Sequence, residues 1–188
     1  MTSPIFISSD HAGIKLKSFL LKNLTKHLVT DLGPLSYSSG SGSGADAGSG
    51  AGADSDAKNF SVDYPDFADL VCKKIQEHNN SLSKGILICG SGQGMVMRAN
   101  KYHFIKAGLC HTSYCAKLIR QHNDANVLCL AARPVSEKEN ADFINNPSIV
   151  NNKLFANALK IVETFLSSDF QGGRHNDRVK KLQTKVTN

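Results

Sequence analysis

The sequence lacks tryptophan, closely spaced cysteine pairs and any apolar run long enough to cross a bilayer. A membrane-spanning helix needs about 20 consecutive apolar residues, whereas the longest apolar runs, such as residues 85–89 and 127–132, have the length of strands. The first apolar stretch has no positively charged segment before it, and Asp10 and His11 interrupt it, unlike a secretory leader. We therefore expect a cytoplasmic protein without a membrane partner.

The cysteine pattern argues against stabilisation of the fold by disulfides or by a structural zinc ion. An odd number of cysteines without a C-x-x-C pair suggests neither a disulfide framework nor a zinc site. A single domain of 188 residues also buries enough surface to fold without such staples. The five cysteines stand at positions 72, 89, 110, 115 and 129.

The chain is basic, with a formal net charge of +6. Residues 39–57 hold three Asp and no Lys or Arg, so the rest carries 22 basic against 13 acidic residues, a net charge of +9. This leaves a non-catalytic phosphate-binding or nucleic-acid-binding module as an alternative. The sequence has neither RNP-like aromatics nor a helix-turn-helix pattern, so we expect no nucleic-acid partner.

One segment has a composition unlike the rest of the chain. Residues 38–57 hold six of the 15 Gly and no large apolar residue, and Gly/Ser-rich segments of this kind form flexible coils. The roughly 38 residues before the segment are too few for a core of their own. We expect one domain spanning residues 1–188, with a disordered insertion at about residues 38–58.

Outside this segment, short apolar runs alternate with amphipathic stretches. Such alternation predicts right-handed βαβ units, and hence an α/β fold with a parallel sheet covered on both faces. A further helix is expected at residues 155–166, after an Asn-rich turn that includes Pro147, and a short one in the tail. The predicted strands are residues 4–8, 28–32, 84–89, 105–110 and 126–131, and the predicted crossover helices are 14–27, 65–78, 93–101 and 113–122.

In such a fold, ligands bind outside the carboxyl ends of the strands. Three strand-end loops carry candidate residues, namely 8–13, 89–94 and 111–112. The richest is GSGQG at 90–94, whose amides and following helix favour an anion, although it is neither a Walker loop nor a full G-x-G-x-x-G. Cys89 directly precedes these amides. We expect its pKa to be lowered, so that the thiolate serves as a base or nucleophile.

Six motifs together resemble the ribose-5-phosphate isomerase B family and its relatives, the galactose-6-phosphate isomerases of the lactose pathway. Their order covers nearly the whole chain. The motifs are SDHAG at residues 9–13, VDYPDFA at 62–68, GILICGSGQGM at 85–95, ANK at 99–101, HNDANVL at 122–128 and GGRHNDRV at 172–179.

The resemblance implies a Rossmann-like αβα sandwich with a five-stranded parallel sheet and a C-terminal helical extension. It also implies metal-independent aldose–ketose isomerisation of a sugar phosphate, without a cofactor, through a cis-enediolate. The family's proton-transferring residue falls on Cys89, its hydroxyl neighbour on Ser91 and its ring-opening residue on His122. We expect amides of the 90–94 loop to stabilise charge on the reacting oxygen.

The same resemblance implies a substrate site shared between the subunits of a homodimer, with a tetramer as the alternative. Each site is expected to borrow residues from the partner, including the His of the HND motif. Asp10 and Asn123 match contacts to sugar hydroxyls, and Tyr64 matches an aromatic wall. The full set expected to bind substrate is Asp10, His11, Tyr64, Gly90, Gly92, Gly94, Asn123, Arg133, Arg174 and Arg178.

The chain departs from the family pattern beside the reactive loop. Gln93 stands where a small apolar residue is frequent, and Val96, Met97 and Arg98 replace small residues at the start of the following helix. These changes put the shape of the pocket in question and remove no catalytic group. Ribose 5-phosphate is the expected substrate, and galactose 6-phosphate or allose 6-phosphate is the alternative, because the same residues serve five-carbon and six-carbon sugars.

Overall fold

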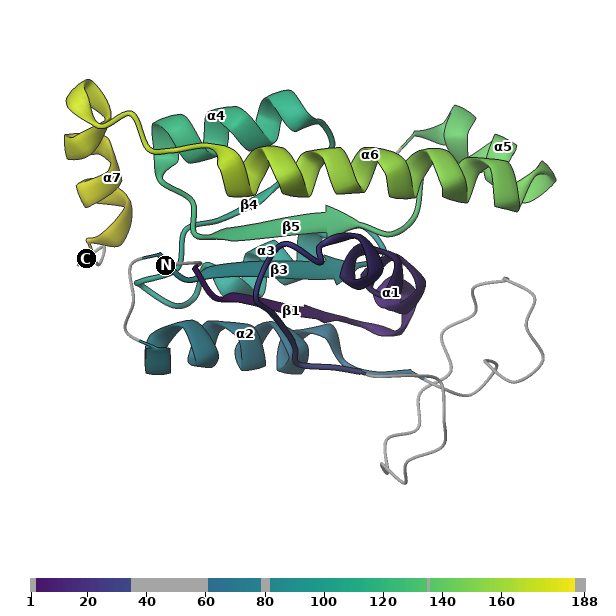
Figure 1. Cartoon of the computed structure of the whole chain (residues 1–188), viewed down its shortest axis with the longest axis horizontal. Coiled ribbons are helices and arrows are strands. Elements are labelled where there is room, and N and C mark those ends of the chain that lie inside the picture. Colours follow the sequence, from purple (N-terminus) through teal and green to yellow (C-terminus); the bar gives the residue numbers. More distant parts are fainter. Residues whose placement is uncertain (1–2, 35–60, 79–81, 135, 185–188) are drawn as a thin grey trace.

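The structure, a computed structural model, describes residues 3–34, 61–78, 82–134 and 136–184. The insertion expected at about residues 38–58 lies outside the described residues. Within them, five strands form one parallel sheet in the order β2-β1-β3-β5-β4 (Figure 1). The strands are β1 (Ile5–Ser9), β2 (Val29–Asp31), β3 (Lys84–Cys89), β4 (Ala107–Leu109) and β5 (Val127–Ala131).

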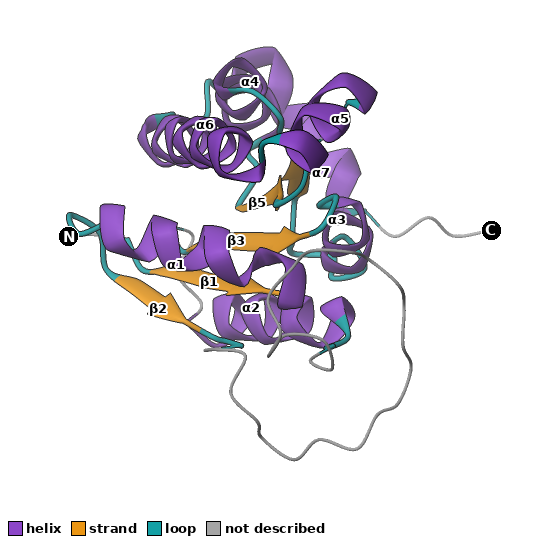
Figure 2. Ribbon diagram, turned by 90° about the vertical axis from the view of Figure 1, so that its right-hand side faces the viewer, coloured by secondary structure: helices purple, strands orange, loops and turns teal. Residues whose placement is uncertain are grey.

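Helices cover the sheet on both faces, as the alternating pattern predicts. On one face α1 (Ile14–Asn23), α4 (Ser113–Asn123) and α6 (Pro147–Ser167) pack against alternate side chains of the central strands, such as Ile86 and Leu128. On the other face α2 (Tyr64–His78) and α3 (Gln93–Ala99) pack against their neighbours, such as Leu87 and Cys129. The strands therefore lie between two helical layers, with α4 and α6 opposite α2 (Figure 2).

The C-terminal region differs from the sequence prediction in its first part. The predicted Asn-rich turn is helical, because α5 (Glu137–Asn145) occupies its start and α6 begins at Pro147. Proline suits this position, since its fixed φ matches a helix and its missing N–H is not needed in the first turn. The expected tail helix is present as a 3₁₀ turn η2 (Gly173–His175) followed by α7 (Asn176–Gln183).

The strand order determines where a ligand can bind. From β1 the chain passes to β2 on one side and then returns past β1 to β3 on the other. The reversal opens a crevice at the carboxyl edge between β1 and β3, the usual ligand site of an open α/β sheet. The loop after β1, with the 3₁₀ turn η1 (His11–Gly13), and the loop after β3 meet there.

Among the described helices, none is both long and apolar enough to span a membrane.

Candidate active site

A cleft of about 530 Å³ opens at this carboxyl edge. The loops after β1, β3, β4 and β5 contribute to it, together with the first residue of α2 and one residue of α5. Loops that follow four different strands thus converge on one space. The lining residues are Asp10, Tyr64, Cys89, Gly90, Ser91, Gln93, Gly94, His111, Arg133, Pro134 and Asn140.

Cys89 ends β3 at the base of this cleft and is only 5% exposed. The Gly92 N–H donates to its Sγ at 3.1 Å, and the N–H groups of Ser91 and Met95 also favour the thiolate. Burial nevertheless raises the pKa of the thiol, and the Asp10 carboxylate raises it further. The predicted lowering of this pKa is therefore wrong for the single chain, because desolvation outweighs the converging amides.

Gly92 has the left-handed backbone that turns the chain from β3 into α3, with φ of 77°. A Cβ here would lie 2.4 Å from Leu109 Cδ1 and 3.0 Å from the Leu130 carbonyl. Only glycine combines this conformation with so close an approach. The N–H of Gly92 points at Cys89 and holds its sulfur, and the expected contact of Gly92 with substrate stays a prediction.

Asp10 lies beside Cys89, directly after β1. Its backbone N–H donates to the Ile88 carbonyl at 2.9 Å, and its carboxylate accepts the Gly13 N–H at 3.0 Å. Desolvation raises the pKa of this carboxyl, against the opposing effects of His11 and nearby N–H groups that include Gly90. Asp10 is thus held by both strands of the crevice while its side chain lines the cleft.

Tyr64 forms one wall of the cleft at the first residue of α2, where it is 40% exposed. Its ring packs over Gly94, since a Cβ on Gly94 would lie 2.6 Å from two ring carbons. Just before α2 begins, the Val62 N–H donates to His11 Nδ1 at 3.4 Å. The two expected binding residues Tyr64 and His11 therefore both border the β1–β3 crevice.

Arg133, just after β5, supplies the positive charge of the cleft. Its backbone N–H donates to the Gly90 carbonyl at 3.1 Å. Its guanidinium also lies close to Gly90, 3.6 Å from a Cβ built there. Ser91 exposes its hydroxyl on the same loop, where it accepts the Gln93 N–H at 3.3 Å. An anionic group in the cleft would meet this guanidinium and the neighbouring loop together.

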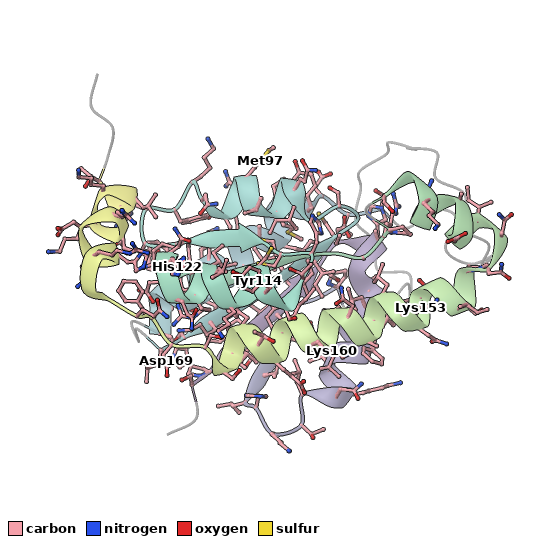
Figure 3. The ribbon with its side chains drawn as sticks, turned by 90° about the horizontal axis from the view of Figure 1, so that it is seen from above. Met97, Tyr114, His122, Lys153, Lys160 and Asp169 are labelled. Carbon is pink, nitrogen blue, oxygen red and sulfur yellow. The ribbon has the colours of Figure 1, made fainter. Side chains whose placement is uncertain are left out.

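The remaining expected site residues lie at the opposite edge of the sheet. In a parallel sheet each crossover helix runs back toward the amino ends of the strands, so α4, which ends at Asn123, carries His122 there. The His122 ring stacks on His175 of η2, with centroids 4.4 Å apart and planes 10° from parallel. Figure 3 shows His122 beside the C-terminal helix, far from Lys153, which lines a second pocket together with Arg133.

The structure thus divides the expected residues into two groups. Asp10, Tyr64, Arg133 and most of the 89–94 loop line the cleft, and His11 lies next to Asp10 in the turn after β1. The other group, which we call the amino-edge cluster, comprises His122, Asn123, Arg174 and Arg178, on α4, η2 and α7. Desolvation, His122 and the two arginines of the cluster lower the pKa of His175, consistent with a concentration of positive charge.

Sequence reasoning missed part of the cleft. His111 and Gln93 lie in loops that the sequence had marked as candidates, but neither was named as a site residue. Pro134 and Asn140 were not predicted, because Pro134 follows β5 in a loop that was not a candidate and Asn140 lies on the polar helix α5, which was not predicted. Among residues 3–34, 61–78, 82–134 and 136–184, no three His, Cys, Asp or Glu side chains gather in a group that could hold a metal ion.

Comparison with known proteins agrees with this fold. The family model described as Ribose/Galactose Isomerase matches residues 49–146. A Mycoplasma pneumoniae protein described as a probable ribose-5-phosphate isomerase B is 41% identical over 97% of this chain and 94% of its own length.

Solved structures give the same result. A ribose 5-phosphate isomerase from Thermotoga maritima is 33% identical with a TM-score of 0.71, covering 97% of this chain and 99% of that one. Ribose-5-phosphate isomerase B from Mycoplasma genitalium, with bound ribulose-5-phosphate, is 36% identical with a TM-score of 0.70, covering 97% and 95%.

With the parallel αβα fold, these relatives place the chain in the class of aldose–ketose isomerases of sugar phosphates. The chain belongs to the ribose/galactose isomerase family.

Proposed function

We propose that this protein interconverts ribose 5-phosphate and ribulose 5-phosphate in the cytoplasm, as a dimer with two shared sites. The observation that carries the proposal is the Cys89 thiol at the base of the cleft, surrounded by backbone N–H groups. The family supports it, as does the similar Mycoplasma genitalium structure that holds ribulose-5-phosphate.

Isomerisation requires one base that serves two adjacent carbons. In open-chain ribose 5-phosphate the Cys89 thiolate removes the proton from carbon 2. The C–H electron pair forms the carbon 1–carbon 2 double bond, and the carbonyl π electrons move to oxygen 1, giving a cis-enediolate. Ser91 passes the oxygen 2 proton to oxygen 1, and the Cys89 thiol then returns its proton to carbon 1, leaving a ketone at carbon 2.

Charge grows on oxygen 1 only as carbon 2 loses its proton. Amides of the 90–94 loop stabilise this oxygen more than the ground-state carbonyl, so they accelerate the reaction and do not merely bind substrate. Asp10 and Tyr64 hold the carbon chain against the loop, while His11 and Arg133 bind the phosphate end. Since both ends are fixed, carbon 1 and carbon 2 stay beside one sulfur.

We assign ring opening and the second part of phosphate binding to the amino-edge cluster, which lies outside this cleft. The amino-edge cluster supplies them only from a second copy, placed so that His122 of the partner subunit protonates the ring oxygen. Arg174 and Arg178 of the partner subunit then meet the phosphate, and Asn123 of the partner subunit meets a sugar hydroxyl. Their positive charge also favours the Cys89 thiolate, which burial disfavours in the single chain.

The molecule exposes a surface suited to such a partner. Strand β4 is an edge of the sheet, and the helices on its two sides expose Met97 to 65% and Tyr114 to 67%. Burying such large apolar side chains is a favourable term in association. A symmetric contact across this edge gives both copies the same environment.

The direct test is an isomerase assay on purified protein with ribose 5-phosphate, galactose 6-phosphate and allose 6-phosphate in parallel. We expect the highest kcat/KM with ribose 5-phosphate. A preference for a six-carbon substrate would move the protein to the other activity in the family description, Ribose/Galactose Isomerase. No turnover of any of the three would contradict the proposal.

The assay on wild-type protein is paired with Cys89→Ala and Cys89→Ser. A serine hydroxyl is too weak a base at neutral pH, so both variants should lose more than about tenfold in kcat, a barrier increase above about 1.4 kcal/mol. The circular dichroism spectrum and sedimentation should match those of the wild type. A variant that retains more than about a tenth of the turnover would show that Cys89 is not the base.

A further inference from the structure

An ion pair joins the two helices that border the cleft. On α3, Arg98 Nε and Nη2 each lie 2.6 Å from one carboxylate oxygen of Asp69 on α2. Two parallel N–H···O bonds of this kind are strong and fix direction as well as distance. The pair is half-shielded, because Arg98 is 41% exposed and Asp69 only 17%.

Tyr102 completes the contact. The Arg98 guanidinium lies 5.9 Å from the centre of its ring, and the Tyr102 side chain also lowers the pKa of Asp69. The hydrogen bond from Arg98 and the other charged neighbours keep the pKa of the Asp69 carboxyl below its usual range, so the pair stays ionised at neutral pH. We call Asp69, Arg98 and Tyr102 the helix clamp.

The clamp lies close to the reacting groups without entering the cleft. Asp69 follows Tyr64, the wall of the cleft, by five residues on α2, and Arg98 follows Gly94 by four residues on α3. The two helices therefore meet at two levels, with the Tyr64 ring on Gly94 at the cleft and the ion pair about one turn below. Any tilt at the clamp moves Tyr64 relative to the loop.

Helix α3 needs such a fixture. It has only seven residues, and no side chain caps its start, where Gly92 is the N-cap residue. Isolated helices of this length are unstable, so its position depends on tertiary contacts. Its first turn includes Met95, whose N–H favours the Cys89 thiolate, while α2 has 15 residues and a longer buried face.

We propose that Arg98 and Asp69 are positioning residues for the isomerisation, because their clamp fixes the first turn of α3 against Tyr64 and Cys89. The inference rests on the proposed function and extends it to two residues outside the cleft. It also gives Arg98, a departure from the family pattern, a role in this chain. The clamp acts on the alignment of amides with the transition state, so its loss lowers kcat more than it raises KM.

The test compares Arg98→Ala and Asp69→Asn with the matched control Lys74→Ala/Glu77→Ala. The control removes another ion pair of α2, 3.0 Å long, in which both residues are exposed. We expect each clamp variant to lose about tenfold in kcat with KM changed less than about twofold. Arg98→Lys, which keeps the charge but not the fork, should fall between Arg98→Ala and the wild type, and the control should match the wild type.

Coupling separates positioning from general stability. The double variant Arg98→Ala/Asp69→Asn should have a kcat no lower than that of the more impaired single variant, because both residues serve one contact. The proposal is overturned if kcat is unchanged in both single variants. It is also overturned if the control loses as much as they do, or if only the free energy of unfolding changes.

A second measurement does not depend on the substrate. The rate at which iodoacetamide alkylates Cys89 reports its surroundings, with the exposed Cys115 as the reference in the same mass spectra. We expect Asp69→Asn to change the ratio of the two rates at least about threefold, and an unchanged ratio overturns the proposal. If the wild type turns over none of the sugar phosphates, the proposed function fails, and this ratio alone decides whether the clamp positions the loop.

Discussion

Cys89 shows at the scale of one residue how burial and hydrogen bonding oppose each other. Three backbone N–H groups favour its thiolate, yet burial raises its pKa above the ordinary value. Its neighbours in sequence indicated only the amides, because the depth of a side chain depends on what packs over it. In the single chain the neutral thiol of Cys89 is therefore favoured over the thiolate.

This balance predicts the pH dependence of thiol reactivity in the protein without substrate. Since the folded pKa is raised, the thiolate fraction of Cys89 increases with pH throughout the neutral range. The alkylation rate should rise about tenfold per pH unit near pH 7, without a plateau below about pH 8. Iodoacetamide labelling followed by mass spectrometry measures it. A plateau below about pH 8 would mean that the amides outweigh burial.

Two glycines of one loop offer a matched comparison. The three atoms nearest to a Cβ at Gly94 all belong to the ring of Tyr64, which is 40% exposed and can turn away. A Cβ at Gly92 would instead contact the Leu130 backbone, and the φ of +77° there is strained for any residue with a side chain. Gly94→Ala should cost less than about 1 kcal/mol of unfolding free energy and raise KM about tenfold, because the cleft wall moves.

Gly92→Ala should instead destabilise the protein by about 2 kcal/mol or more, since an L-residue is strained there. Urea unfolding and steady-state kinetics on both variants check the contrast. Equal losses of stability in the two variants would contradict this description of the loop.

At the scale of elements, the sequence predicted all five strands and the four crossover helices, because the alternation of buried runs and amphipathic helices persists through β1 to β5. The predictions failed where the pattern is weak. Helix α5 is polar on average and the first two turns of α6 carry asparagines, so this region was predicted as a turn, whereas the apolar residues of 155–166 predicted a helix. Asn140, which α5 brings to the cleft, could not be found from the sequence for the same reason.

The edge strand β2 depends on one buried ion pair. Lys17 of α1 is 1% exposed and lies 2.5 Å from Asp31 at the end of β2, and it also donates to the Pro34 carbonyl at 2.7 Å. Asp31 in turn accepts the Gly33 N–H at 2.9 Å. With only three residues, β2 has few other contacts, so this pair fixes the end of the strand beside α1.

Asp31→Ala should destabilise the protein by about 3 kcal/mol, because it leaves the Lys17 ammonium buried without a counter-charge. Lys17→Met/Asp31→Ala should be more stable than Asp31→Ala alone, since it removes the stranded charge as well. Urea unfolding of the three proteins measures both differences. A double variant less stable than Asp31→Ala would show that the lysine does not depend on this carboxylate.

At the scale of the whole molecule, the fold separates residues that the proposed mechanism needs together. The cleft with Cys89 lies at the carboxyl edge of the sheet, and His122, at the end of α4, lies at the amino edge beside α7 (Figure 3). The family resemblance supplied the idea of shared sites, and composition and spacing could not, because a motif carries no information about which copy it serves. The central claim is that each complete site combines two copies.

Subunit complementation tests this claim most directly. Cys89→Ala and His122→Asn, each nearly inactive alone, are unfolded together in equal amounts and refolded so that subunits mix. In a mixed dimer one site carries both substitutions and the other carries neither. Random pairing therefore predicts recovery of about a quarter of the wild-type activity, with wild-type KM. Activity that stays at the level of the two separate variants, with mixed dimers shown to form, would mean that Cys89 and His122 of different copies do not share a site.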